Sequence, residues 1–182
     1  MNNKAIFVVD MINGFVKEGA LSDIKINEIT PNIIKSINKV GRENTYFIVD
    51  SHTNESKEFD DFLSHCLRDT NEAKIIDELL PYVSNDIVYK NSTNAFHVMD
   101  INKYLKYDNY YVVGCCTDIC VISLAISLKT YINENNLAKE VYVVEDACST
   151  FDIVNHSALE YHNMAIKLMM TNGIKILSSE EI

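Results

Sequence analysis

Two patterns of hydrophobic residues alternate along the chain. Short runs rich in β-branched and aromatic residues are separated by longer segments in which apolar residues recur at helical spacing. Runs of the first kind are typical of buried strands, and segments of the second kind are typical of amphipathic helices. The first pattern predicts about six strands, at residues 4–10, 45–50, 86–90, 109–114, 140–146 and 173–177.

The second pattern predicts the helices that connect these strands. They are expected at residues 26–40, 71–83, 98–107, 118–135 and 156–173, and Asn172 with Gly173 gives the last one a C-cap signal. Strands and helices that alternate in this way form right-handed βαβ units, whose parallel sheet is covered by helices on both faces. The sequence therefore predicts an α/β fold with three Rossmann-like layers.

Length and composition favour a single domain. The chain has 182 residues, 47% of them hydrophobic, which suffices for one well-packed core. The sequence contains no internal repeat, low-complexity stretch or Gly/Pro/Ser linker. We therefore expect one domain over residues 1–182.

Charge limits the partners of the protein. A formal net charge of -10 and an isoelectric point near 4.9 argue against a nucleic-acid surface or an anionic membrane, because both need clustered Lys and Arg. No apolar run approaches the roughly 18 residues of a membrane-spanning helix. The short apolar start that ends at Asp10 is unlike a signal peptide. We expect a cytoplasmic protein that binds a small molecule, with homo-oligomerisation left open.

Chemically reactive residues follow most of the predicted strands. Open α/β sheets bind ligands at the carboxyl ends of their strands, so a functional site is expected there. An acidic residue after one strand is ordinary turn chemistry, but agreement over five strands favours a site. The residues at these ends are Asp10, Asp50 with His52, Lys90, Gly114 with Cys115 and Cys116, and Glu145 with Asp146.

Three cysteines lie within the segment "VVGCCTDICV". Thr117 and Asp118 are good N-cap residues, which would place Cys120 in the first turn of a helix, where the dipole and the free amides favour a thiolate. Cys120 is therefore a candidate nucleophile, and Asp10 and Lys90 are candidates for its base and its electrostatic partner.

The other cysteines have simpler explanations. Cys66, Cys115 and Cys148 are expected to pack as small hydrophobic residues. Cys116 and Cys120 are spaced for a redox or zinc pair, although this is not the thioredoxin spacing, and no second cysteine pair completes a zinc tetrahedron.

The segments "FVVDMINGFV", "VYKNSTNAF" and "VVGCCTDICV" together resemble the isochorismatase-like cysteine hydrolase superfamily. The resemblance extends over nearly the whole chain and implies the isochorismatase-like α/β fold and a catalytic triad of Asp10, Lys90 and Cys120. It also implies a cis peptide between Cys115 and Cys116, with the amides of Cys116 and Cys120 forming an oxyanion hole. The segment "STNAF" departs from the usual Tyr-Ser before Ala-Phe.

A second group of polar residues follows the second strand. Asp50, His52, Glu58 and His65 are ligand types suited to zinc, iron or manganese, although a polar active-site loop would have a similar composition. Within the superfamily this segment most resembles the nicotinamidases, and the resemblance implies that these four residues bind a divalent metal, with zinc first.

The same resemblance implies a function for two aromatic residues and for the whole site. Phe15 and Phe62 match positions that stack on a pyridine ring, Phe62 replacing the usual Trp. The implied reaction is hydrolysis of nicotinamide to nicotinate and ammonia through a thioester, in NAD salvage, without an organic cofactor. Two alternatives are a metal-independent hydrolase of another amide, ureido or vinyl-ether substrate, and a redox or non-catalytic thiol protein that uses Cys116 and Cys120.

Overall fold

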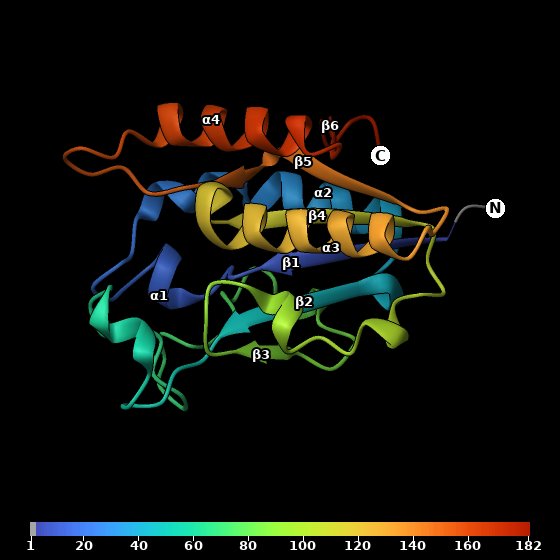
Figure 1. The fold of residues 1–182 in the computed structure, drawn as a ribbon. Helices are drawn as coiled ribbons and strands as arrows, with labels where there is room; N and C mark the ends of the chain where they lie inside the picture. Colours follow the sequence, from blue (N-terminus) through green and yellow to red (C-terminus); the bar gives the residue numbers. More distant parts are fainter. Residues whose placement is uncertain (1–2) are drawn as a thin grey trace.

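The computed structural model of the protein, which describes residues 3–182, is built around one parallel sheet of six strands (Figure 1). The strand order is β3-β2-β1-β4-β5-β6, and every neighbouring pair is parallel. This confirms the predicted α/β sheet. The strands are β1 (Lys4–Val9), β2 (Thr45–Asp50), β3 (Val88–Lys90), β4 (Asn109–Cys115), β5 (Glu140–Ser149) and β6 (Lys175–Leu177).

Helices cover both faces of this sheet, as the sequence predicted. Three of the five expected helices are present, while the expected helices over 71–83 and 98–107 were wrong. The helices are α1 (Asn13–Val16), α2 (Thr30–Val40), α3 (Ile122–Glu134) and α4 (Ala158–Thr171), with short 3₁₀ turns η1 (Ile24–Ile29), η2 (Arg42–Asn44), η3 (Lys57–Asp60), η4 (Leu80–Tyr82), η5 (Ala95–His97) and η6 (Ile101–Lys103), and a π-helical turn η7 (Thr117–Val121).

Local hydrogen bonding explains the two missing helices. Within residues 98–107 only the short turn η6 is helical, and the Asp100 side chain at its start accepts a hydrogen bond from the Asn102 amide at 3.2 Å, a pattern that competes with the helix ladder. Residues 71–83 form turns that end in η4, which contains Pro81. Apolar residues of both segments, such as Leu79 and Tyr104, are buried, so their spacing reflected packing of turns rather than helical periodicity.

The core lies on both sides of the sheet because successive strand residues face opposite ways. Ile6 and Val8 of β1 belong to the cluster that packs against α2, whereas Phe7 belongs to the cluster that includes α3 and α4. In Figure 1, α3 lies in front of the strands and α2 behind them. Among residues 3–182, no helix is long and apolar enough to cross a membrane.

The strand order determines where a ligand can bind. The chain runs from β1 outward through β2 to β3, then crosses back to place β4 on the other side of β1. The direction of winding therefore reverses between β1 and β4, and open α/β sheets bind ligands in the crevice outside such a switch point.

Gly114 permits close contact between the two central strands. Its φ is +114°, and a Cβ added there would overlap the carbonyl oxygen of Val9 and lie 2.8 Å from the Val9 amide nitrogen. The register between β4 and β5 shifts at the same point, between Val112 and Gly114. A side chain would therefore force the backbones of β1 and β4 apart at the switch point.

We expect Gly114→Ala to lower the free energy of unfolding by about 3 kcal/mol or more, because both the φ angle and the overlap oppose a Cβ. Urea unfolding of the purified variant measures this. Gly173→Ala is the matched control, since Gly173 also has positive φ (+81°) but its Cβ would meet only the flexible Lys129 side chain at 3.3 Å; the control should cost about 1 kcal/mol. Equal losses would contradict the packing argument.

Candidate active site

Four strand ends place chemically reactive residues in a row at one edge of the sheet. Lys90 closes β3, Asp50 closes β2, Asp10 follows β1, and the turn that carries Cys120 follows β4. Asp50 and Lys90 are register partners in the β2–β3 pair. Parallel pairing therefore brings together residues that are up to 110 positions apart in the sequence.

The ammonium group of Lys90 lies at the centre of this row. Its Nζ is 2.9 Å from Asp10 Oδ2 and 2.7 Å from Asp50 Oδ1. The same atom is 3.7 Å from the Sγ of Cys120. Lys90 is only 2% exposed, and both carboxylates are at most 1% exposed. A buried lysine is tolerated where its charge is paired and hydrogen-bonded, and here two carboxylates meet that need.

The backbone of Asp10 turns sharply so that its side chain faces the row. Its φ is +52°, in the left-handed region that Asp and Asn tolerate better than most residues. Its amide donates to the carbonyl of Ile48 at 2.9 Å, and its Oδ1 accepts from the Asp50 amide at 3.0 Å. Strand pairing thus holds both the backbone and the carboxylate.

Burial and neighbouring charges raise the pKa values of Asp10, Cys120 and Lys90. Desolvation raises the pKa of Asp10 to about 6, although Lys90 opposes the shift. Desolvation also raises the pKa of the Cys120 thiol, again against the effect of Lys90. The two carboxylates raise the pKa of Lys90, outweighing its burial. The resting site therefore holds a protonated thiol beside a permanent cation and a carboxylate able to exchange a proton near neutral pH.

Cys120 lies in the turn η7, which differs from the helix start expected at Thr117 and Asp118. The residue before the turn is Cys116, whose carbonyl accepts from the amides of Ile119 and Val121, each at 3.1 Å. Residues 117–121 form a π-helical turn and the α-helix begins only at Ile122. Cys120 nevertheless remains in the first turn after β4, 6% exposed.

The other two cysteines of this segment flank the strand end. The peptide bond between Cys115 and Cys116 is cis. The Cys115 thiol is fully buried and donates to the carbonyl of Asp10 at 3.1 Å, so this thiol points into the protein. Cys116 is 7% exposed and lines the same cavity as Cys120.

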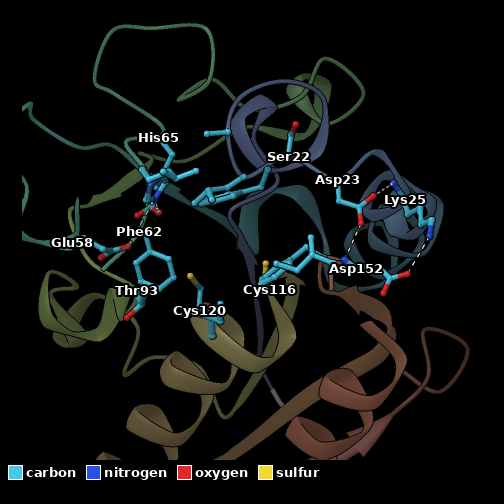
Figure 2. Close-up of a pocket in the computed structure, with 18 residues that line it drawn as sticks. Ser22, Asp23, Lys25, Glu58, Phe62, His65, Thr93, Cys116, Cys120 and Asp152 are labelled. Carbon is cyan, nitrogen blue, oxygen red and sulfur yellow. Dashed lines mark hydrogen bonds and ion pairs between the residues drawn. The ribbon is translucent and has the colours of Figure 1, made fainter. Parts of the chain in front are cut away.

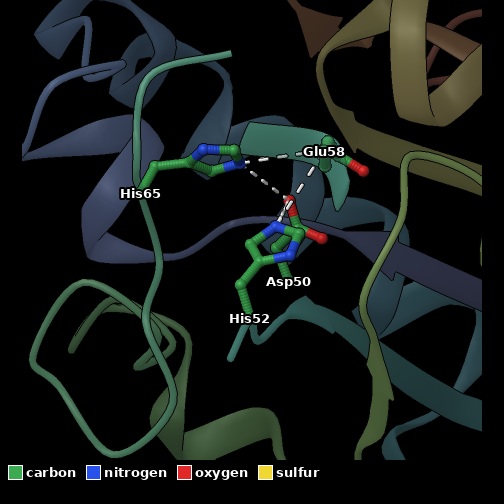
Figure 3. Close-up of side chains that lie close together, drawn as sticks. All are labelled: Asp50, His52, Glu58 and His65. Atoms are coloured by element: carbon green, nitrogen blue, oxygen red, sulfur yellow. Dashed lines mark ion pairs between the residues drawn. The ribbon is translucent and has the colours of Figure 1, made fainter. Parts of the chain in front are cut away.

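A second cluster lies beside the row and shares Asp50 with it (Figure 3). Asp50, His52, Glu58 and His65 each offer one ligand atom, and these atoms lie within 4.8 Å of one another. Asp50 Oδ2 is 3.3 Å from His52 Nε2 and 3.5 Å from His65 Nε2. Since the other oxygen of Asp50 contacts Lys90, this carboxylate joins the two clusters.

The hydrogen bonds of the two imidazoles fit a metal site. His65 Nδ1 lies 2.7 Å from the Leu63 carbonyl, an acceptor, so this nitrogen carries the proton and Nε2 offers a lone pair. His52 Nδ1 lies 3.0 Å from Asn91 Oδ1 and 3.1 Å from Ser56 Oγ, while its buried Nε2 has no hydrogen-bond partner. Both lone pairs face carboxylate oxygens, an arrangement that a cation stabilises.

The charges of this cluster support the same conclusion. Burial lowers the pKa of His52, but the Asp50 carboxylate raises it by more. Burial and the Asp50 charge both raise the pKa of Glu58. The cluster thus carries excess negative charge, which either a proton or a divalent cation can neutralise.

Both clusters open into one cavity of about 490 Å³ (Figure 2). Cys116 and Cys120 line it from one side, and Asp50, Glu58 and His65 line it from another. Most of the remaining wall is apolar and includes the two aromatic residues predicted for ring stacking. The apolar wall residues are Phe15, Ala20, Leu21, Phe62, Leu63, Ile119, Phe151 and Ile153.

Several residues of the site carried no signal in the sequence. Phe151 and Ile153 reach the cavity from the loop after β5, and Asn91 contacts His52 from the loop after β3. One expectation at a strand end was wrong, because Glu145 and Asp146 lie inside β5, which continues to Ser149. Asp146 instead accepts hydrogen bonds from Ser179 near the C-terminus.

Known proteins resemble this chain in sequence. Nicotinamidase 1 of Arabidopsis thaliana is 27% identical over 176 residues, which are 84% of this chain and 72% of that protein. The nicotinamidase of Acinetobacter baylyi is 27% identical over 219 residues, which span 100% of this chain and 95% of that protein.

The resemblance extends to solved structures and to a domain family. The crystal structure of the pyrazinamidase of Pyrococcus horikoshii in complex with zinc has a TM-score of 0.77 at 23% identity, covering 97% of this chain and 99% of that one. At that identity the likeness shows a shared fold. Residues 4–181 match the isochorismatase domain family. The parallel sheet, with reactive residues at the switch point between β1 and β4, is thus accompanied by a sequence match over nearly the whole chain. The chain belongs to the isochorismatase family.

Proposed function

We propose that the protein is a nicotinamidase, which hydrolyses nicotinamide to nicotinate and ammonia and so serves NAD salvage. One observation carries the proposal: a buried Cys–Lys–Asp group and a cluster of four metal-type ligands lie side by side, and Cys120 of the first group and Asp50, Glu58 and His65 of the second line a single cavity. The names of the two curated relatives support the same substrate. Ammonia release from nicotinamide, measured with and without a chelator, tests it.

Cys120 is the nucleophile in this proposal and Asp10 is its base. The pKa of Asp10 is raised to about 6 by burial, which suits a carboxylate that accepts a proton near neutral pH and later returns it. Asp10 takes the thiol proton, and the sulfur attacks the carboxamide carbon while the carbonyl electrons move to the oxygen. Lys90, 3.7 Å from the sulfur, stabilises the negative charge of the pair.

The remaining steps use the same groups in reverse. The amides of Cys116 and Cys120 donate to the oxyanion. As the C–N bond breaks, Asp10 gives its proton to the departing nitrogen, and ammonia leaves behind a thioester on Cys120. A water molecule then attacks this thioester, Asp10 accepts a proton from the water, and the thiol and nicotinate are released.

Asp50, His52, Glu58 and His65 would hold a divalent metal, for which zinc is the first candidate, as the zinc-bound pyrazinamidase with the same fold suggests. When bound, such an ion would supply a Lewis acid for an electron-rich atom of the substrate. Phe15 and Phe62 line the same part of the protein, with their rings 5.6 Å and 6.3 Å from the His65 ring. Together these residues orient a flat aromatic ring beside Cys120.

Replacing the nucleophile should abolish the reaction without unfolding the protein. We expect Cys120→Ala to have no measurable ammonia release, because it lacks the thiol that lies 3.7 Å from Lys90 Nζ. Cys148→Ala is the matched control, since Cys148 is also a buried thiol, 4% exposed, but packs in the core away from the cavity. Circular dichroism checks the fold of both variants. Turnover by Cys120→Ala at the wild-type rate would contradict the assignment of Asp10, Lys90 and Cys120 as the catalytic triad.

The two charged partners of Cys120 should differ in their effects. Asp10→Asn should lower kcat about 10²–10⁴-fold, the usual contribution of a positioned base. Lys90→Met should lower kcat at least as much and, in addition, lower the free energy of unfolding by about 3–5 kcal/mol, because it leaves Asp10 and Asp50 buried without a counterion. Steady-state kinetics and urea unfolding separate these effects. A Lys90→Met protein of normal stability would contradict the central role given to the ammonium group.

Metal content decides the choice of substrate. We expect about one equivalent of a divalent transition metal in the purified protein, as for other sites of this ligand set. Chelation should raise the KM for nicotinamide far more than it lowers the Tm, and His52→Ala should behave like the chelated protein. Elemental analysis and kinetics measure both effects.

Benzamide is the control substrate, because it lacks the ring nitrogen. It should react poorly with the metal-loaded protein, and the gap from nicotinamide should narrow after chelation. Absence of metal together with equal rates on both amides would exclude nicotinamide as the preferred substrate and favour a metal-independent hydrolase of another amide, ureido or vinyl-ether compound.

A further inference from the structure

The loop between β5 and α4 forms one wall of the cavity. Phe151, Asp152 and Ile153 line the cavity from this loop. Ile153 and His156 exchange two backbone hydrogen bonds, of 3.1 Å and 3.0 Å, which close a tight turn with Val154 and Asn155 at its tip. Val154 is 87% exposed, so the tip faces solvent while the base of the turn faces the substrate cavity.

His156 holds this turn to the segment that carries Cys120. Its Nε2 is 2.8 Å from Asp118 Oδ2, and Asp118 belongs to the turn η7. Its Nδ1 is 3.0 Å from the carbonyl of Phe151. Its ring stacks on the ring of Phe151, with centroids 3.9 Å apart, and on the ring of Tyr161, with centroids 3.8 Å apart.

The hydrogen bonds of His156 require two protons on its ring. The Phe151 carbonyl can only accept, so Nδ1 must carry a proton. A neutral ring would then turn the bare lone pair of Nε2 toward the Asp118 carboxylate, which is repulsive at 2.8 Å. Two acceptors, the Phe151 carbonyl and the Asp118 carboxylate, thus face the two ring nitrogens. The geometry is therefore that of an imidazolium, which also favours its place between two aromatic faces.

Asp118 depends on this cation. Its Oδ1 is buried and has no hydrogen-bond partner, and among the ion pairs of residues 3–182 Asp118 occurs only with His156. Both side chains are 13% exposed. Asp152 and Tyr161 lie near His156, and His162 lies near Asp118. Of these, His162 has its pKa lowered by burial, so it adds little positive charge.

We propose that His156 is a positioning residue which, as an imidazolium between Asp118 and the Phe151 carbonyl, fixes the Phe151 wall of the cavity relative to Cys120. One face of the Phe151 ring is covered by His156, so the opposite face or the edge meets the substrate. The role in substrate affinity rests on the proposed nicotinamidase function, whereas the charge and the anchoring of the loop do not. The His156–Asp118 pair thereby joins the loop that lines the cavity to the turn η7, which carries Cys120.

Kinetics separate this role from a general effect on the fold. His156→Gln should raise the KM for nicotinamide about tenfold while kcat changes less than about threefold, the pattern of a lost binding contribution. His97→Gln is the matched control, because His97 is exposed and does not line the cavity. A proportional loss of kcat and stability, with unchanged KM, would overturn the positioning role.

Two readouts do not depend on catalysis. In ¹⁵N NMR spectra at pH 7, the His156 ring should show two protonated nitrogens, assigned by their absence in His156→Gln, and Asp118→Asn should convert the ring to the neutral form. Hydrogen exchange of the amides of residues 152–156 should accelerate at least about tenfold in His156→Gln and Asp118→Asn but not in His97→Gln. A neutral ring in the wild type, or unchanged exchange, would overturn the proposal even in a protein without activity on nicotinamide.

Discussion

The contact between the Lys90 ammonium group and two buried carboxylates is the interaction on which the rest of the site depends. Lys90 lies within 2.9 Å of Asp10 and 2.7 Å of Asp50, and none of the three could be buried alone without a large desolvation cost. Each comes from the end of a different strand. The pairing of β1, β2 and β3 and the neutralisation of charge therefore stabilise each other, and the Cys120 thiol lies beside a cation whose position the sheet determines.

Asp50 links the contacts of Lys90 to the second cluster. One oxygen contacts Lys90, and the other faces the Nε2 atoms of His52 and His65. The same carboxylate thus belongs to the charge balance around Cys120 and to the cluster of possible metal ligands. The cavity therefore has two chemically distinct ends, one with the Cys120 thiol and one with acidic and imidazole side chains of the second cluster. This separation is compatible with the proposed flat substrate, whose carboxamide and ring nitrogen lie at different positions.

Sequence patterns predicted the site best where a reactive side chain directly follows a predicted strand. Asp10, Asp50 and Lys90 follow short β-rich runs, and strand ends meet at one edge of a parallel sheet whatever the connecting segments do. The connections were less predictable. Apolar spacing over 71–83 suggested a helix, yet turns bury Ile76 and Leu79 equally well. Phe151 and His156 reach the site from a loop whose path depends on tertiary contacts with Asp118, which no local pattern in the sequence records.

The position of β1 in the sheet also constrains how the chain can fold during its synthesis. The segment 4–90 contains β1, β2 and β3, and with them the three charged residues Asp10, Asp50 and Lys90. One side of β1 remains an unpaired, apolar edge until β4 emerges from the ribosome, because Lys4 pairs with Asn109 and Val9 with Gly114. Such an edge invites pairing with other chains. The residues of these ion pairs are therefore synthesised before Cys120, and this edge of β1 stays open to pairing with other chains until β4 covers it.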